Sequence, residues 1–191
     1  MKKRPPHVKI IGGNFKGFKI QFIPNKFIRP TSNKTRETLF NWLMHDIQKS
    51  QCLDMFAGTG AIGLEALSRG AEFVFFVEKN KNLCEYIQKN LNILSLEKKA
   101  KVINADSLKK DFKKEIKKSL DIVFLDPPFR KNLISRACNL LEKQKILIKK
   151  SLVYAEYEKE LIEEENLIGL NMIKGKVTGQ TIFNLYRKDE V

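Results

Sequence analysis

The sequence predicts an α/β protein with a doubly wound, mostly parallel seven-stranded sheet, an antiparallel C-terminal strand and a small N-terminal β-hairpin/helix extension. Short apolar segments rich in Val, Ile, Leu and Phe alternate with longer segments whose apolar residues recur at helical spacing. A glycine-rich segment separates the first of these strands from the helix that follows it. Acidic residues stand at or just past the ends of four consecutive expected strands, where parallel sheets bind their ligands.

The expected elements follow one another along the chain. Two short strands at 8–11 and 18–23 form a basic hairpin around a glycine turn, and a helix at about 33–48 follows it. The remaining strands are expected at 52–56, 73–77, 101–104, 121–125, 152–156, about 168–174 and about 180–187. Further helices are expected at 61–69, 80–94, 108–118 and 133–143. We therefore divide the chain into a basic extension at 1–32 and an α/β domain at 33–191.

Positive charge is concentrated at the N-terminal end of the chain. The 191 residues include 36 Lys and Arg against 22 Asp and Glu, and residues 1–36 carry ten basic side chains and no acid. A generally Lys-rich composition explains the lysines but not the missing acids, so we expect a nucleic-acid partner. The residues expected to contact it are Lys3, Arg4, Lys16, Lys19, Arg29, Arg36 and Arg130.

Composition also limits where the protein is expected to act and what it is expected to bind. No apolar run approaches the roughly 20 residues that span a bilayer, and the first residues lack the apolar core of a signal peptide. Cys52, Cys84 and Cys138 are far apart, which argues against disulfides or a zinc site. His7 and His45 are isolated. We expect a cytoplasmic monomer with no metal and no membrane contact.

The tetrapeptide Asp126-Pro127-Pro128-Phe129 follows the expected strand at 121–125. Because proline has no N–H and holds the preceding residue extended, the carbonyls of Asp126 and Pro127 are expected to face outward as acceptors. Together with the Asp126 carboxylate and the Phe129 ring, they suit a planar group that carries an amine, such as a nucleobase. The alternative is a plain strand and turn, with Phe129 returning to the core.

A nucleotide-type loop follows the expected strand at 52–56. Gly58, Gly60 and Gly63 form a G-x-G-x-x-G between strand and helix, and Glu78 ends the next strand where it can accept ribose hydroxyls. This pattern alone fits NAD. Asp54, inside the first strand, instead suits a cationic amino-acid group, and Phe56-Ala57-Gly58 is similar to S-adenosylmethionine (SAM) sites.

Asp106 comes two residues after the expected strand at 101–104. In folds of this kind, an acid at that position can accept a hydrogen bond from the adenine amine. The alternative is a helix N-cap.

With these residues placed, the chain resembles the class I SAM-dependent methyltransferases, and more narrowly the RsmD family of bacterial 16S rRNA guanine-N2 methyltransferases. The resemblance covers nearly the whole chain. It rests on the blocks Ile10-Ile-Gly-Gly13, Arg29-Pro-Thr31, Leu39-Phe-Asn-Trp-Leu43, Phe56-Ala-Gly58, Gly63–Ala71, Val123–Arg130, Tyr154 with Glu156, and Gly179-Gln180. It departs at Ser32-Asn33-Lys34-Thr35, where the family usually has an acid, an arginine and a valine.

The resemblance implies a Rossmann-like fold, SAM as cofactor and methylation of guanine 966 (conventional rRNA numbering) in 16S rRNA during small-subunit assembly. Asp126, Pro127 and Phe129 would hold and activate the base, and Thr31 would order the N-terminal loop over SAM. Three alternatives stay open from the residues: an N6-adenine methyltransferase on RNA or DNA, a noncatalytic RNA-binding assembly factor, and a NAD-dependent oxidoreductase.

Overall fold

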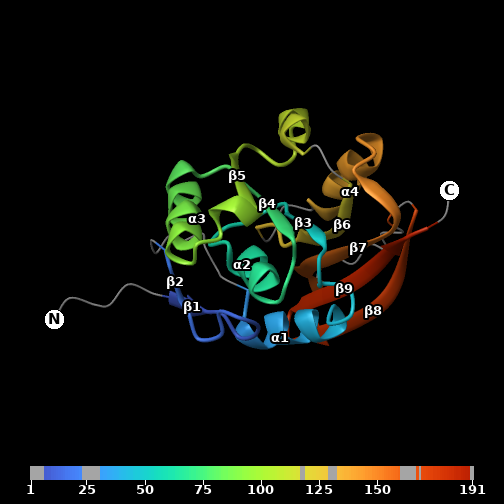
Figure 1. Cartoon of the computed structure of the whole chain (residues 1–191). Helices are drawn as coiled ribbons and strands as arrows, with labels where there is room; N and C mark the ends of the chain where they lie inside the picture. The colour runs from blue at the N-terminus through green and yellow to red at the C-terminus, as the bar shows by residue number, and fades with distance from the viewer. Residues whose placement is uncertain are drawn as a thin grey trace.

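A twisted seven-stranded sheet forms the centre of the protein, in the strand order β5-β4-β3-β6-β7-β9-β8 (Figure 1). This computed structural model describes residues 7–22, 31–116, 119–128, 133–159, 167 and 169–189. The strands are β3 (Gln51–Asp54), β4 (Phe73–Glu78), β5 (Ala100–Asn104), β6 (Leu120–Leu125), β7 (Leu147–Glu158), β8 (Leu170–Thr178) and β9 (Thr181–Lys188). The first five run parallel, and β9 is antiparallel to both β7 and β8.

The chain changes direction across the sheet at β3. From β3 it proceeds outward through β4 and β5, and it then returns to place β6 and β7 on the other side of β3. Neighbouring crossovers therefore diverge at the carboxyl ends of β3 and β6, which is where open α/β sheets bind ligands. The doubly wound sheet with an antiparallel C-terminal part is confirmed.

The sheet separates two apolar cores because alternate residues of each strand face opposite sides. One face is covered by α1 (Asn33–Trp42), α2 (Ala61–Ser68) and α3 (Lys81–Ile93), which pack on strand residues such as Cys52, Phe76 and Phe124. The other face packs on α4 (Ile134–Lys143) and the 3-10 segment η2 (Lys110–Glu115). Figure 1 shows α4 apart from α1 and α2, with the sheet between them.

The N-terminal hairpin, β1 (His7–Lys9) and β2 (Lys19–Gln21), packs against α2 and α3. Its apolar side chains Val8, Ile10, Ile20 and Phe22 belong to the first core. Buried polar groups attach its backbone: Asn90 on α3 accepts a hydrogen bond from the Gln21 N–H at 3.4 Å and donates one to the Gln21 carbonyl at 3.1 Å. The described part of the extension thus shares one core with the α/β domain.

Several elements differ from their expected bounds, and three of the differences have a clear structural basis. Helix α1 ends at Trp42 instead of about residue 48, but the Ile47 N–H still donates to the Leu43 carbonyl at 2.9 Å. A turn therefore places Ile47 in the core, at the four-residue spacing from Leu43 that had indicated a longer helix. The expected helix at 108–118 is the 3-10 segment η2 over its described part. Strand β7 begins at Leu147, five residues early, through an irregular start that includes Lys150 in a left-handed conformation.

Candidate active site

Four carboxylates lie along the carboxyl edge of the sheet on the face that α1, α2 and α3 cover. Asp54 ends β3, Glu78 ends β4, Asp126 follows β6, and Glu156 lies near the end of β7. Their places follow from the register, because Asp54 pairs with both Phe76 and Phe124, two residues before Glu78 and Asp126. Residues two apart on a strand share a face. The first three were expected at this edge from the sequence.

Glu156 was missed as a site residue, although its position carried the same signal as the others. It ends the strand expected at 152–156, as Glu78 and Asp126 end or follow theirs. Its side chain is buried, and its Oε2 accepts a hydrogen bond from the Tyr154 hydroxyl at 2.8 Å.

The glycine loop is shaped by the backbone. Gly58 and Gly60 have φ angles of +53° and +78°, in the left-handed region that favours glycine. Gly63 lies in α2 against β4, where an added Cβ would come within 2.2 Å of the Phe76 ring. The first two glycines therefore allow the turn, whereas the third allows α2 to approach the sheet closely, as in dinucleotide folds.

Asp54, the last residue of β3, stands just before the glycine loop and is 1% exposed. Its Oδ2 accepts a hydrogen bond from the Gly63 N–H at 3.0 Å. Burial raises the pKa of Asp54 to about 7; the Gly63 N–H lowers it, and the charges of Asp126 and Glu78 raise it further. The carboxylates thus lie close enough to repel one another, and a buried excess of negative charge is relieved by a bound cation.

Glu78 connects the loop to the start of α3. Its Oε2 accepts a hydrogen bond from the Gly58 N–H at 2.9 Å, and its Oε1 accepts one from the Asn80 N–H at 2.7 Å. Asn80 in turn caps α3 through its side chain. Phe56 is half-buried beside the loop. Glu78 is therefore held at the point where the loop meets the sheet edge.

Asp106 is exposed at the same edge, just past β5. Its Oδ1 accepts a hydrogen bond from the Leu108 N–H at 3.1 Å, so it caps the turn that follows. This contact agrees with the alternative capping role, and a contact of Asp106 with adenine stays a prediction.

Asp126 is half-buried and accepts a hydrogen bond at Oδ2 from the Thr31 hydroxyl, which comes from the segment preceding α1. Burial raises the pKa of Asp126 to about 6, while the Thr31 hydrogen bond lowers it. Thr31, expected to order a loop over the cofactor, thus contacts the expected catalytic acid. Pro127 is buried next to it, and Phe129 lies outside the described residues.

The expected RNA contacts divide into three groups. Lys16 and Lys19 are exposed on the hairpin. Arg36 is fully buried, which corrects its expected role, because a buried guanidinium cannot reach a phosphate. It donates hydrogen bonds to the Lys9 carbonyl at 2.8 Å and to Asn33 at 2.6 Å, and it pairs with buried Glu65 at 3.4 Å. Outside the described residues lie Lys3, Arg4, Arg29 and Arg130.

Glu65 explains why Arg36 is inside. Its two oxygens accept the Ile11 and Gly12 N–H groups of the hairpin turn, each at 2.8 Å, and it also pairs with Arg69 at 2.7 Å. The Arg36–Glu65–Arg69 cluster therefore fixes the hairpin to α2, the helix that begins at the glycine loop.

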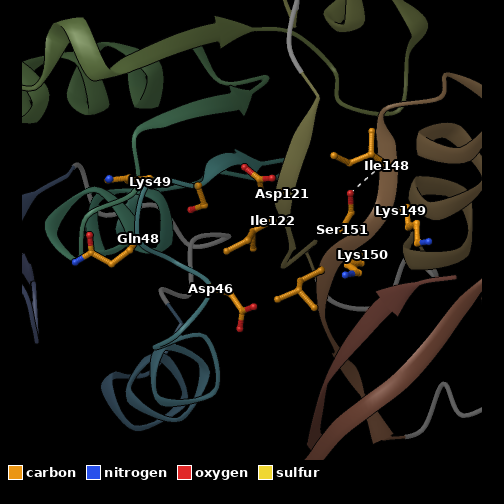
Figure 2. A pocket seen from close by; sticks show the side chains of 11 residues that line it. Asp46, Gln48, Lys49, Asp121, Ile122, Ile148, Lys149, Lys150 and Ser151 are labelled. Carbon is orange, nitrogen blue, oxygen red and sulfur yellow. Dashed lines mark hydrogen bonds between the residues drawn. The ribbon is translucent and has the colours of Figure 1, made fainter. Parts of the chain in front are cut away.

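A pocket of about 270 Å³ opens at the opposite, amino edge of the sheet, where β3, β6 and β7 begin (Figure 2). It is lined by residues such as Asp46, Lys49, Asp121 and Lys150 and lies apart from the four carboxylates. The described segments hold no group of three or more His, Cys, Asp or Glu side chains arranged to bind a metal ion. Within the same residues, no helix combines the length and apolar character needed to cross a bilayer.

The doubly wound sheet, the glycine loop after β3 and the carboxylates at the strand ends define a Rossmann-like methyltransferase. A family model described as "conserved hypothetical protein 95" matches residues 8–187, and the chain belongs to this family, the RsmD family.

The relatives cover nearly the whole chain. It is 43% identical over 185 residues to the ribosomal RNA small subunit methyltransferase D of Haemophilus influenzae, covering 94% of this chain and 93% of that protein. It is 38% identical over 192 residues to the protein of the same name from Escherichia coli K12, covering 98% and 96%. The solved structure of yhhF from Escherichia coli matches with a TM-score of 0.84 at 36% identity, over 96% of this chain and 99% of that chain.

Proposed function

We propose that this protein transfers a methyl group from SAM to the exocyclic N2 amine of a guanine in 16S rRNA, at position 966 in conventional numbering, during small-subunit assembly in the cytoplasm. Relatives named as small-subunit rRNA methyltransferases support the class of substrate. The main support for the proposal is that Asp126 lies close to Asp54, where the crossovers diverge at the carboxyl ends of β3 and β6. Asp126 would bind the amine of the base, and Asp54 would bind the cationic part of the cofactor next to it.

The residues at the glycine loop fit SAM by charge and by space. Asp54, with two further carboxylates nearby, favours the ammonium and sulfonium groups of the cofactor. Glu78 would accept ribose hydroxyls, and Asp106 would accept the adenine amine. Open space at Gly58, where an added Cβ would lie 3.9 Å from its nearest neighbour, lets a ligand approach the backbone.

The guanine amine is a weak nucleophile because its lone pair is delocalised into the ring. When bound, SAM supplies an electrophilic methyl group on a sulfonium, a good leaving group. The protein has to align the amine and localise its lone pair. Asp126 and the Pro127 carbonyl accept the two N2 hydrogens. A carboxylate whose pKa is about 6 is mostly ionised at neutral pH and can also take the proton that the amine loses.

The exposed lysines of the hairpin, Lys16 and Lys19, extend the site toward RNA. Their side chains attract phosphates without reading sequence, so their contribution falls as salt rises. The target guanine has to be unpaired or flipped out, because Asp126 and Pro127 engage its Watson–Crick edge. Phe129 would stack on the base.

The decisive experiment combines gene deletion with complementation. Mass spectrometry of 16S rRNA from cells lacking the protein should show the loss of one N2-methylguanine, which wild type restores and Asp126→Ala does not. Asp121→Ala, at the opposite end of the same strand β6, is the matched control and should restore methylation. Unchanged rRNA in the deletion strain refutes the proposed substrate, and loss of an N6-methyladenine instead would establish the adenine alternative.

Measuring SAM binding by itself distinguishes residues needed for catalysis from residues needed for cofactor affinity. Calorimetry should show that Asp126→Ala still binds SAM while Glu78→Ala binds it more weakly. Absence of SAM binding by the wild-type protein would revive the noncatalytic assembly factor. Turnover of Asp126→Ala above a tenth of the wild-type rate would remove Asp126 from its assigned role.

A further inference from the structure

The last two strands of the sheet carry charge of one sign. The segment from Leu170 to Lys188, which comprises β8, its turn and β9, contains four basic residues and no Asp or Glu. One of the four, Lys188, is buried and pairs with Glu142 at 2.8 Å. The other three are exposed. Residues 1–36, where most of the RNA contacts were expected, have the same one-signed pattern, which indicates a polyanion partner.

Strand β8 is an edge strand. It lies at one end of the sheet, and β5 lies at the other (Figure 1). Every residue from Asn171 to Thr178 is exposed, including Lys174 and Lys176. Lysines on an exposed edge strand also hinder its pairing with another strand. The position of these two lysines relative to the active site therefore decides which role they suit.

Both lysines lie on the face of the sheet that α1 covers. In the β8–β9 register, Lys174 pairs with Leu185 and Lys176 pairs with Phe183. Residues paired in this way share a face, and Leu185 and Phe183 belong to the core under α1. A direct contact agrees with the register, because the Lys176 Nζ lies 3.5 Å from the Thr38 Oγ1 on α1. This is also the face of the four carboxylates.

Helix α1 connects the lysines to the expected catalytic acid. Thr31, two positions before the first residue of α1, donates a hydrogen bond to Asp126, and Thr38 contacts Lys176. The seven positions from Thr31 to Thr38 span roughly 10 Å at a helical rise of about 1.5 Å per residue. Stacked nucleotides rise about 3.4 Å each along a strand. Lys176 therefore lies within a few nucleotides of a base held by Asp126.

The lysines and the N-terminal hairpin lie on different sides of the active site. The hairpin packs against α3, which lies over β4 and β5, whereas β8 lies beyond β6, β7 and β9. The carboxyl ends of β3 and β6 stand between the two. The exposed charges of α1, on Lys34 and Glu37, have opposite signs, so the positive excess beside this helix comes from β8.

We propose that Lys174 and Lys176 form a second RNA-binding surface, which holds phosphates of 16S rRNA beside the target guanine while the hairpin holds the RNA on the other side. This inference rests on the proposed function. The two lysines act by charge and do not read sequence, so they raise affinity for RNA without contacting the reacting groups.

The first test measures methyl transfer to 16S rRNA, naked or in small subunits from cells lacking the protein, whichever the wild type methylates. Lys174→Gln/Lys176→Gln should raise KM for the RNA about tenfold at about 50 mM salt, with kcat and SAM affinity within roughly twofold of wild type. The slope of log KM against log salt should fall by about one to two, because each lysine neutralises about one phosphate. Lys174→Arg/Lys176→Arg keeps both charges and should behave as wild type.

Lys98→Gln/Lys99→Gln is the matched control. It removes two exposed charges just before β5, the opposite edge strand, and should leave KM and its salt dependence unchanged. An unchanged KM in Lys174→Gln/Lys176→Gln, or an equal rise in the control, would overturn the inference. Self-association of the variant with an unchanged KM would assign the lysines to protection of the edge strand alone. Wild type that methylates neither form of the RNA refutes the proposed function instead, so the two failures are distinguishable.

A crosslink tests the identity of the partner directly. Cys52, Cys84 and Cys138 are buried, so a thiol-reactive photo-crosslinker on Lys176→Cys labels a single surface position. With the methylated form of the substrate RNA or subunit present, this position should crosslink to 16S rRNA, and Lys98→Cys should not. Absence of an RNA crosslink at Lys176→Cys, including a crosslink to a ribosomal protein in its place, would overturn the inference.

Discussion

Replacing Asp54 by asparagine tests the electrostatics of the site most directly. Asp54→Asn removes the charge but keeps an oxygen that can accept the Gly63 N–H. Because burial raises the pKa of Asp54 to about 7 from an ordinary value of 3.8, holding it ionised in the folded state is unfavourable. We expect the variant to be more stable than wild type at pH 8 and to bind SAM more weakly.

The magnitude and sign of this stability difference follow from the linkage between folding and proton binding at Asp54. Below pH of about 4, Asp54 is protonated in both the folded and the unfolded state and contributes no difference. Between about 4 and 7 the unfolded state releases the proton first, so stability falls as pH rises. Above 7 the full penalty applies: a difference of about three pKa units corresponds to roughly 4 kcal/mol, taken as an upper limit.

The assay is urea denaturation of wild type and Asp54→Asn between pH 5 and 8, without cofactor. The stability difference in favour of the variant should grow by at least about 1 kcal/mol over this range. In parallel, SAM binding to wild type near pH 7 should release protons, visible as a dependence of the calorimetric enthalpy on the buffer. A stability difference that does not vary with pH, together with binding that releases no protons, would refute the reasoning.

Two further predictions concern the neighbours of these acids. Thr31→Val should lower kcat about tenfold and move the acid limb of its pH profile to higher pH, because the pKa of Asp126 rises without the hydroxyl donor. Thr31→Ser keeps the hydroxyl and should behave as wild type. An acid limb that does not move in Thr31→Val would contradict the assignment. Gly63→Ala should lower the free energy of unfolding, measured in urea, by about 1–3 kcal/mol, since its Cβ would lie 2.2 Å from the Phe76 ring. Partial rescue by Phe76→Leu would identify this clash as the cause. A Gly63→Ala variant as stable as wild type would exclude the clash.

The local pattern of the chain was enough for the sheet and for three of the four carboxylates that lie on one face of its carboxyl edge. Short, continuously apolar strands, helices at 3.6-residue spacing and an acid at each strand end are short-range features, so Asp54, Glu78 and Asp126 could be located in advance. The same reasoning would have reached Glu156 had its strand end been treated like the others. It overextended α1, because a turn places Ile47 at helical spacing without a helix.

Arg36 shows where sequence reasoning stops. Ten basic residues without an acid among the first 36 indicate a polyanion partner, but they do not show which side chains face solvent. The acid that takes Arg36 inside is Glu65, 29 residues away on another helix, and it also binds the hairpin backbone. A contact over that separation depends on how α1, α2 and the hairpin pack.

Composition, periodicity and motif spacing determined the fold class, the glycine loop and the order of the acids along the chain, since each depends on residues close together in sequence. Only the tertiary structure decided which hydroxyl meets which carboxylate. Thr31 reaches Asp126 across 95 positions, and the strand register pairs Leu125 with Ala155, the residues just before Asp126 and Glu156. Side-chain pairing and pKa values depend on distance and burial, and these exist only once the strands and helices have packed together.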